Sequence, residues 1–161
     1  MILAAFFVGA AGLHQGAKLP IILAGIQAGG TTVADRPKIA RNKWPENPGY
    51  ELTVTPFEGR VRVRFAGATV ADSRSALLLL EQGHSPLYYL PQRDLHMELV
   101  RPSEHRSHCP YKGHCSYYSI VVGDKVSENA IWSYEDPYPE IREITALVAF
   151  YPNRVDAIDV E

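Results

Sequence analysis

Residues 107–118 hold most of the side chains in this sequence that could do chemistry. The segment reads Ser-His-Cys-Pro-Tyr-Lys-Gly-His-Cys-Ser-Tyr-Tyr and contains both cysteines, two of the six histidines, a lysine and three tyrosines. Its proline and glycine predict a turn, in which the lysine could fold back toward a sulfur atom. Nucleophiles, acid–base groups and aromatic surface are therefore gathered in one predicted loop.

Cys109 is the candidate nucleophile of this loop, and Lys112 is the group that would activate it. A thiolate needs nearby positive charge to lower its pKa, and Lys112, His108 and His105 are all close in the sequence. No third residue that would orient the pair can be identified from the sequence. The alternative is a buried structural cysteine at the start of a strand, since unpaired cysteine is among the most buried residue types.

A zinc site is a second and weaker interpretation of the same loop. Cys109, Cys115, His108 and His114 would supply nitrogen and sulfur ligands for a tetrahedral ion. The cysteines lack the common Cys-x-x-Cys spacing, and adjacent His-Cys residues on an extended strand would point to opposite faces. We therefore assign no metal ligands, and the identity of any cofactor is left open.

Aromatic residues form the second group of candidates. Tyr and Trp bury a ring while keeping a polar group, which suits the wall of a small-molecule pocket. Neighbouring tyrosines on a strand point to opposite faces, so a core position is an equally good interpretation of any single ring. Asp94 could supply an acid–base carboxylate, although a turn is the commoner place for it. The candidate ligand-binding residues are Tyr88, Tyr89, Asp94, His108, Tyr111, Gly113, Tyr117, Trp132 and Tyr134.

The elements that position these residues are predicted to be short strands. Val61, Val63 and Phe65 alternate with Arg62 and Arg64, which puts the apolar side chains on one face and the arginines on the other. A capped short helix is predicted over residues 76–81, and a helical turn over residues 140–144. Strands are predicted over residues 52–57, 61–65, 68–71, 87–90, 95–99, 117–122, 130–134, 147–151 and 155–160. This pattern favours a mainly β fold, either an antiparallel sandwich or a partly closed barrel, with one or two short helices.

Residues 1–34 differ from the rest, because they contain no acid and only one base, Lys18. Their two apolar runs are each shorter than the about 20 residues that span a bilayer, and the start lacks the positive charge of a signal peptide. We interpret them as an apolar leader, either disordered or the product of a misassigned start. Residues 35–161 are predicted to form a single β-rich domain, entered by a proline-rich arm whose Trp44 packs on it.

Composition limits the class of protein and of partner. Of 161 residues, 46% are hydrophobic and 21% charged, as in an ordinary soluble domain. The net charge of −2, with both signs interspersed, lacks the basic surface of a nucleic-acid binder. Two cysteines are too few for a disulfide framework and indicate a reducing compartment. We expect a cytoplasmic protein that binds neither nucleic acid nor membrane; its oligomeric state stays open.

Several segments together resemble a family catalogued as domain of unknown function 427, also labelled nucleotidyltransferase-like. The resemblance covers residues 34–160 and implies a compact, β-rich intracellular domain with no established activity. In that family the position of Cys115 is often alanine and that of His108 often threonine, so a mechanism requiring either would not extend to all members. The matching segments are residues 36–37, 75–80 with Gly83, 86–91 with Asp94, 109–113 with Tyr117, 132–134 with Pro137, and 149–152 with 154–156.

The nucleotidyltransferase label has no support from the residues. Enzymes of that class carry a Gly-Ser turn followed by paired aspartates that hold two metal ions. No such turn precedes an Asp-x-Asp pair here, and neither a Walker loop nor a Gly-x-Gly-x-x-Gly motif is present. The aspartates are scattered, at Asp94, Asp124, Asp136, Asp156 and Asp159.

The sequence favours a β domain that binds a small molecule, with an enzymatic role for Cys109 left undecided. The site would form where residues 109–118 meet residues 88–94 and 132–137. The alternative is a non-catalytic interaction or scaffold module, which a buried Cys109, an ion-paired Lys112 and the lack of a concave site would favour. A zinc-stabilised domain is the weaker alternative.

Overall fold

Strands dominate the computed structural model, which describes residues 42–161. The expected leader of residues 1–34 and the first residues of the arm lie outside the described residues. The strands are β1 (Leu52–Pro56), β2 (Val61–Phe65), β3 (Ala68–Ser73), β4 (Leu77–Glu81), β5 (Leu87–Pro91), β6 (Val100–Cys109), β7 (Gly113–Val122), β8 (Lys125–Ser133), β9 (Leu147–Phe150) and β10 (Ala157–Val160). Short 3₁₀ helices connect them: η2 (Trp44–Glu46), η3 (Gln92–Asp94), η4 (Met97–Leu99), η5 (Pro139–Ile144) and η6 (Pro152–Arg154). The prediction of a mainly β fold is confirmed.

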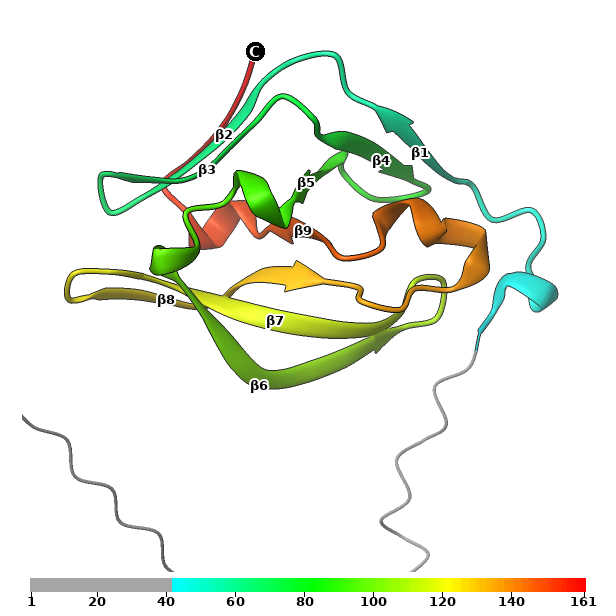
Figure 1. Ribbon diagram of the computed structural model, residues 1–161. Helices are drawn as coiled ribbons and strands as arrows, with labels where there is room; N and C mark the ends of the chain where they lie inside the picture. The colour runs from blue at the N-terminus through cyan, green and yellow to red at the C-terminus, as the bar shows by residue number, and fades with distance from the viewer. Residues whose placement is uncertain (1–41) are drawn as a thin grey trace, which may run out of the picture. The chain divides into compact units, whose positions relative to one another are not determined.

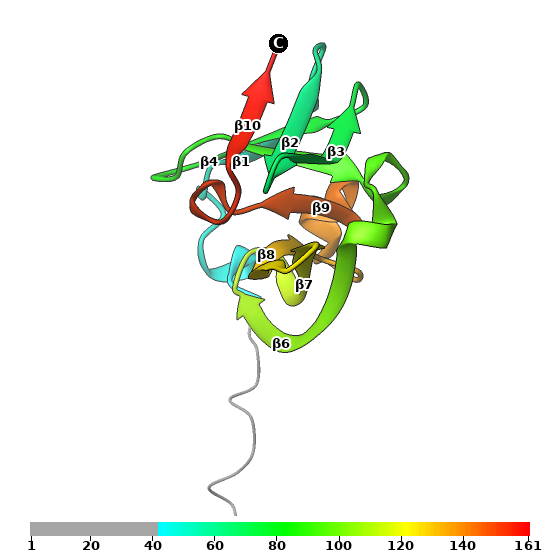
Figure 2. The same cartoon turned by 90° about the vertical axis from the view of Figure 1, so that its left-hand side faces the viewer.

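Two antiparallel sheets make up the domain. The larger has seven strands in the order β1-β4-β5-β9-β8-β7-β6, and the smaller has three in the order β10-β2-β3. The large sheet folds back on itself, so that β6, β7 and β8 lie below β9 while β1, β4 and β5 lie above it (Figure 1). It does not close into a barrel, because β1 and β6 remain its two edges. The small sheet stands beside β9 at the end of the molecule that holds the C-terminus (Figure 2).

Alternation along the strands creates two separate cores. Val61 and Val63 of β2 are fully buried and pack with Leu90 and Phe150 in the core between the sheets. A second core on the other face of the large sheet is dominated by aromatic side chains and is covered by η5. Its buried members are Leu79, Tyr89, Cys115, Tyr117, Trp132, Tyr134, Ile141, Ile144 and Ala149.

The predicted helix over residues 76–81 is wrong, because this segment is strand β4. A run of leucines is compatible with either a helix or a strand. Here the segment is a strand because its backbone pairs with β1 on one side and β5 on the other. Its side chains alternate accordingly: Leu79 is fully buried and Leu80 is 46% exposed. The helical turn predicted at residues 140–144 is present as η5.

Two further predictions differ from the structure in detail. Residues 95–99, expected to be a strand, largely form η4, with Met97 49% exposed and Leu95 buried. Only Leu95 makes a bridge, to Ala71 of β3. The predicted loop around Cys109 is instead the tight end of the long β6–β7 hairpin, in which Ser107 pairs with Cys115 and Cys109 with Gly113. Within residues 42–161, none of the helices is long and apolar enough to cross a membrane.

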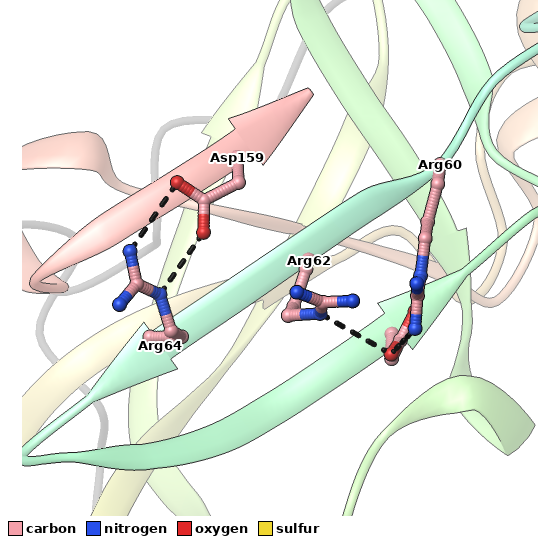
Figure 3. A network of polar contacts seen from close by, with 5 residues as sticks. Arg60, Arg62, Arg64 and Asp159 are labelled. Carbon is pink, nitrogen blue, oxygen red and sulfur yellow. Dashed lines mark hydrogen bonds and ion pairs between the residues drawn. The ribbon is translucent and has the colours of Figure 1, made fainter. Parts of the chain in front are cut away.

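Ion pairs hold the strands of the small sheet together on its polar face. Arg64 on β2 reaches Asp159 on β10, with Nε 2.9 Å from Oδ2, and Arg60 and Arg62 turn toward β3 (Figure 3). There the Arg60 guanidinium makes two hydrogen bonds to the carboxylate of Asp72, at 2.7 and 2.5 Å. These bonds from Arg60 are the main reason why the pKa of Asp72 falls to about 2.

Asp72→Asn should lower the stability of the domain at neutral pH and not in strong acid. Because the folded-state pKa is depressed, the contribution of Asp72 is present above its unfolded value of 3.8 and is lost as the pH falls toward about 2. The unfolding free energies of wild type and variant should therefore converge as the pH approaches 2. Urea unfolding at several pH values measures this, with Asp124→Asn in the β7–β8 turn as a charge-matched control. A difference that is constant with pH would contradict the ion-pair explanation.

Candidate functional site

A buried ion pair between Lys112 and Glu81 lies at the centre of the candidate site. Lys112 occupies the turn between β6 and β7, where its N–H donates to the Cys109 carbonyl. Its Nζ lies 2.5 Å from Oε2 of Glu81, the last residue of β4, and both side chains are only 6% exposed. The other Glu81 oxygen accepts a hydrogen bond from the Tyr50 hydroxyl at 2.9 Å. Burial and this bond raise the pKa of Tyr50 to about 12.

Cys109 lies beside this pair, and Cys115 is enclosed in the aromatic core. The Cys109 Sγ is 4.0 Å from the Lys112 Nζ, so the ammonium is much closer to the Glu81 carboxylate than to the thiol. Cys109 is half-buried, while Cys115 is 2% exposed. Burial raises the pKa of the Cys115 thiol, against the opposing effect of hydrogen bonds with nearby hydroxyl groups. Of the two thiols, Cys109 is thus the accessible one.

A cavity of about 390 Å³ adjoins the lysine side of the pair. Five of the nine lining residues are Tyr or Trp: Tyr89, Tyr117 and Trp132 lie on β5, β7 and β8, Tyr134 follows β8, and Tyr151 follows β9. Side chains alternate along these strands, so that every second residue faces the second core. The lining residues are His84, Leu87, Tyr89, Lys112, Tyr117, Trp132, Tyr134, Tyr151 and Pro152. Five of the residues proposed from the sequence therefore meet around one hollow: Tyr89, Lys112, Tyr117, Trp132 and Tyr134.

Hydrogen bonds fix the orientation of the aromatic rings in the wall. The Trp132 Nε1–H donates to the Tyr89 hydroxyl oxygen at 3.1 Å, and the Tyr117 hydroxyl is 2.7 Å from the Ser107 hydroxyl. The Trp132 and Tyr151 rings are 4.4 Å apart and tilted by 47°. Burial raises the pKa values of Tyr89, Tyr117 and Tyr134 above the ordinary tyrosine value. These hydroxyls therefore stay protonated at neutral pH.

The other candidates lie away from the cavity. Tyr88 faces the opposite side of β5, with its ring 5.0 Å from that of Phe57. Asp94 accepts a hydrogen bond from the Ser73 hydroxyl at 2.6 Å. His108 bonds to the Tyr138 hydroxyl at 2.8 Å, and burial, with the charge of nearby His114, lowers the pKa of its imidazole.

Tyr111 and Gly113 shape the turn that carries Lys112. The Tyr111 ring stacks on Tyr50 at 3.7 Å, and its carbonyl accepts the Trp44 Nε1–H at 2.8 Å. The prediction that Trp44 packs on the domain is thus confirmed. Gly113 has a φ of +104°, a left-handed conformation that favours glycine, and lies against the backbone of Asp136 and Pro137. Both residues support the site from outside the cavity.

Glu81 is the residue of the candidate site that the sequence did not reveal. It lies 31 positions before Lys112 in the chain and follows a run of leucines that was interpreted as a helix, so no local pattern connects the two. Glu81 and His84 also line an open hollow of about 610 Å³ next to the start of β1 and the end of β4. His84 borders both hollows, and it was not singled out from the sequence.

Zinc has no obvious set of ligands in this region. Among residues 42–161, no three His, Cys, Asp or Glu side chains are grouped so that they could hold a metal ion. His108 and His114 have their rings 5.1 Å apart, but His108 is engaged with Tyr138. The zinc hypothesis remains a prediction that metal analysis of the purified protein would test.

Lys112→Met should destabilise the fold by about 3–5 kcal/mol, because it leaves the Glu81 carboxylate buried without a counter-charge. Adding Glu81→Gln should recover much of this loss, since the glutamine is neutral and its oxygen still accepts the Tyr50 hydroxyl bond. Urea unfolding of the wild type, both single variants and the double variant measures the coupling. If the losses of the two single variants simply add in the double variant, the pair is not coupled as described.

Iodoacetamide should modify Cys109 in the folded protein and spare Cys115. Cys115 is almost fully enclosed, and burial raises the pKa of its thiol, so it offers little thiolate. Mass spectrometry should find one labelled cysteine per native chain and two after unfolding. Cys109→Ser should abolish native labelling, and the matched variant Cys115→Ala should not change it. Equal labelling of both thiols in the native protein would contradict the burial described here.

A family model with the description "Domain of unknown function (DUF427)" matches residues 53–161. The match runs from β1 to the last residue and therefore includes Glu81, Lys112 and every residue that lines the aromatic cavity. No curated protein matches the chain.

Proposed function

Because the chain belongs to the DUF427 family, whose description assigns no activity, we propose a function from the site itself: the domain binds a small molecule in the aromatic cavity beside Lys112. The ligand would lie against Tyr89, Trp132 and Tyr151 and would meet the ammonium group at one side. This proposal makes the Lys112–Glu81 pair part of a binding site as well as a structural link.

The observation that carries the proposal is the combination of an aromatic hollow with one buried charged group. Small-molecule sites are concave and largely apolar, with volumes of about 300–1,000 Å³ and a few well-placed polar groups. The cavity, at about 390 Å³, lies within that range, and Lys112 is one of its lining residues beside tyrosine and tryptophan side chains.

An enzymatic role for Cys109 is the second candidate. It is favoured by the Lys112 Nζ at 4.0 Å from the thiol, because a nearby cation stabilises a thiolate. Against it, the ammonium is bonded to Glu81, and Cys109 is not among the described residues that line the cavity. A covalent reaction would therefore require the ligand to reach past Lys112. Ligand binding without catalysis is the better supported of the two.

An interaction or scaffold module is the alternative from another class. The ion pair of Lys112 favours such a module. The concave site favours binding of a small molecule instead. We also propose a cytoplasmic location, which the unpaired Cys109 and Cys115 support, because free thiols persist in reducing compartments.

A fragment screen followed by NMR should detect binding through Trp132. The protein has two tryptophans, so a ¹⁵N-labelled sample has two indole N–H signals, one in the cavity wall and one, from Trp44, on the arm. Bound fragments should shift the Trp132 signal in a saturable way, and by more than the Trp44 signal, because the Trp44 indole is bonded to Tyr111 and does not line the cavity. Trp44→Phe assigns the two signals.

Filling the cavity should abolish the response. Leu87→Phe adds bulk to the lining, and Val126→Phe adds the same kind of ring at an exposed site in the β7–β8 hairpin. The first variant should lose fragment binding and the second should retain it. If a broad fragment set never moves the Trp132 signal in the wild type, the binding proposal is overturned and the interaction module becomes the leading function.

A further inference from the structure

Cys109 and Lys112 place a thiol and an amine at the two ends of one tight turn. The Lys112 N–H donates to the Cys109 carbonyl at 3.3 Å, and Pro110 occupies the second position of the turn, which proline favours. The Lys112 Nζ lies 4.0 Å from the Cys109 Sγ. Because the backbone already holds the two groups together, a bond between them would close only a short loop at little entropic cost.

The Cys109 sulfur is accessible to a small oxidant. Cys109 is half-buried, whereas Cys115 is 2% exposed in the aromatic core. Peroxides oxidise the thiolate form, so a cysteine reacts more readily where it is accessible and where positive charge is near. The Lys112 ammonium provides that charge. We therefore expect hydrogen peroxide to oxidise Cys109 before Cys115 and to form a sulfenic acid.

Glu81 can take the proton that the Lys112 amine must lose before it forms a bond. A protonated ammonium has no lone pair and cannot act as a nucleophile. The Glu81 Oε2 lies 2.5 Å from the Lys112 Nζ, and both side chains are 6% exposed. Transfer of one proton along this contact leaves two neutral groups, so no buried charge loses its partner. The ion pair thus holds the amine in place and also offers it a base.

We propose that hydrogen peroxide joins Cys109 and Lys112 through a covalent sulfur–nitrogen bond, which makes this turn a reversible site of oxidative modification. The inference goes beyond ligand binding and does not require the cavity to be occupied. The modification would still alter the cavity, because Lys112 is one of its lining residues and loses its positive charge in the bridged form.

The reaction consumes one peroxide molecule and balances in two steps. In the first, the Cys109 thiolate attacks a peroxide oxygen: the S–O bond forms, the O–O bond breaks, and the departing hydroxide takes up a proton to become water. The sulfur is oxidised and the peroxide is reduced, by two electrons in each case. In the second, the Lys112 nitrogen gives one proton to Glu81 and attacks the sulfur, so that the S–N bond forms, the S–O bond breaks, and the hydroxide leaves as water with the second amine proton. Two molecules of a thiol reductant restore the amine and the cysteine and become a disulfide.

Hydrogen peroxide treatment of Cys115→Ala tests the bridge. The chain has two cysteines, so this variant cannot form a disulfide within one chain, which would cause the same change in mass. Intact-mass spectrometry should show chains that have lost two hydrogens, and dithiothreitol should restore the original mass. A non-reducing tryptic digest should no longer cleave after Lys112, so residues 107–112 and 113–125 should appear as one peptide. The same treatment in urea, where the turn is unfolded, should leave this cleavage intact.

Lys112→Arg in the same background is the matched variant. Arginine keeps a positive charge opposite Glu81, but its guanidinium stays protonated and cannot form the bond. Cys109 should therefore stop at the sulfenic acid, and dimedone, which labels sulfenic acids, should modify it several-fold more than in the chain that retains Lys112. The indole N–H signals of Trp44 and Trp132 check that the variant is folded. If it does not fold, the peptide map of the chain with Lys112 still decides the question.

Three results would overturn the inference. One is continued cleavage after Lys112 in native chains whose Cys109 has been oxidised. Another is equal dimedone labelling of the two chains in the comparison. The third is a joined peptide that retains one oxygen, which identifies an N–O–S link in place of the direct bond. The test needs no small-molecule ligand, so its failure would leave the proposed function standing.

Discussion

The bond between Lys112 and Glu81 is the contact on which the other features of the site depend. It joins the end of β4 to the turn between β6 and β7, two segments at opposite ends of the strand order of the large sheet. A buried charge without its partner is strongly destabilising, so neither Lys112 nor Glu81 can be replaced alone by an uncharged residue without a large cost. This ion pair brings the two ends of the folded sheet toward each other, and the aromatic hollow lies beside it, next to Lys112.

Alternation along β5 explains why the hollow is aromatic. Tyr89 faces the second core while Tyr88 and Leu90 face the first, so one tyrosine of the adjacent pair enters the cavity wall and the other does not. On β7 and β8, Tyr117 pairs directly with Trp132. Both side chains line the hollow beside Lys112.

The parts of the structure that follow from local pattern could be predicted, and those that depend on distant pairing could not. Val61 and Val63 alternate with arginines, so a strand with one buried face was evident from the sequence. The leucines of β4 carry no such contrast, and hydrogen bonds to β1 and β5 determine their conformation. Lys112 was recognisable from its neighbours, but its partner Glu81 was not, because the contact joins segments 31 residues apart.

Residues that precede β1 make hydrogen bonds to the turn that carries Lys112. The Lys43 N–H donates to the Pro110 carbonyl at 2.9 Å, and the Trp44 indole donates to Tyr111. The Tyr50 hydroxyl donates a hydrogen bond to Glu81. The arm therefore contacts Glu81 directly, and it contacts Lys112 through the neighbouring residues of the turn. These residues lie before residue 53, where the family match starts. A fragment that began at residue 53 would lose only Leu52 from the strands and would still lose these contacts. The residues that support the Lys112–Glu81 pair thus extend further toward the N-terminus than the family match.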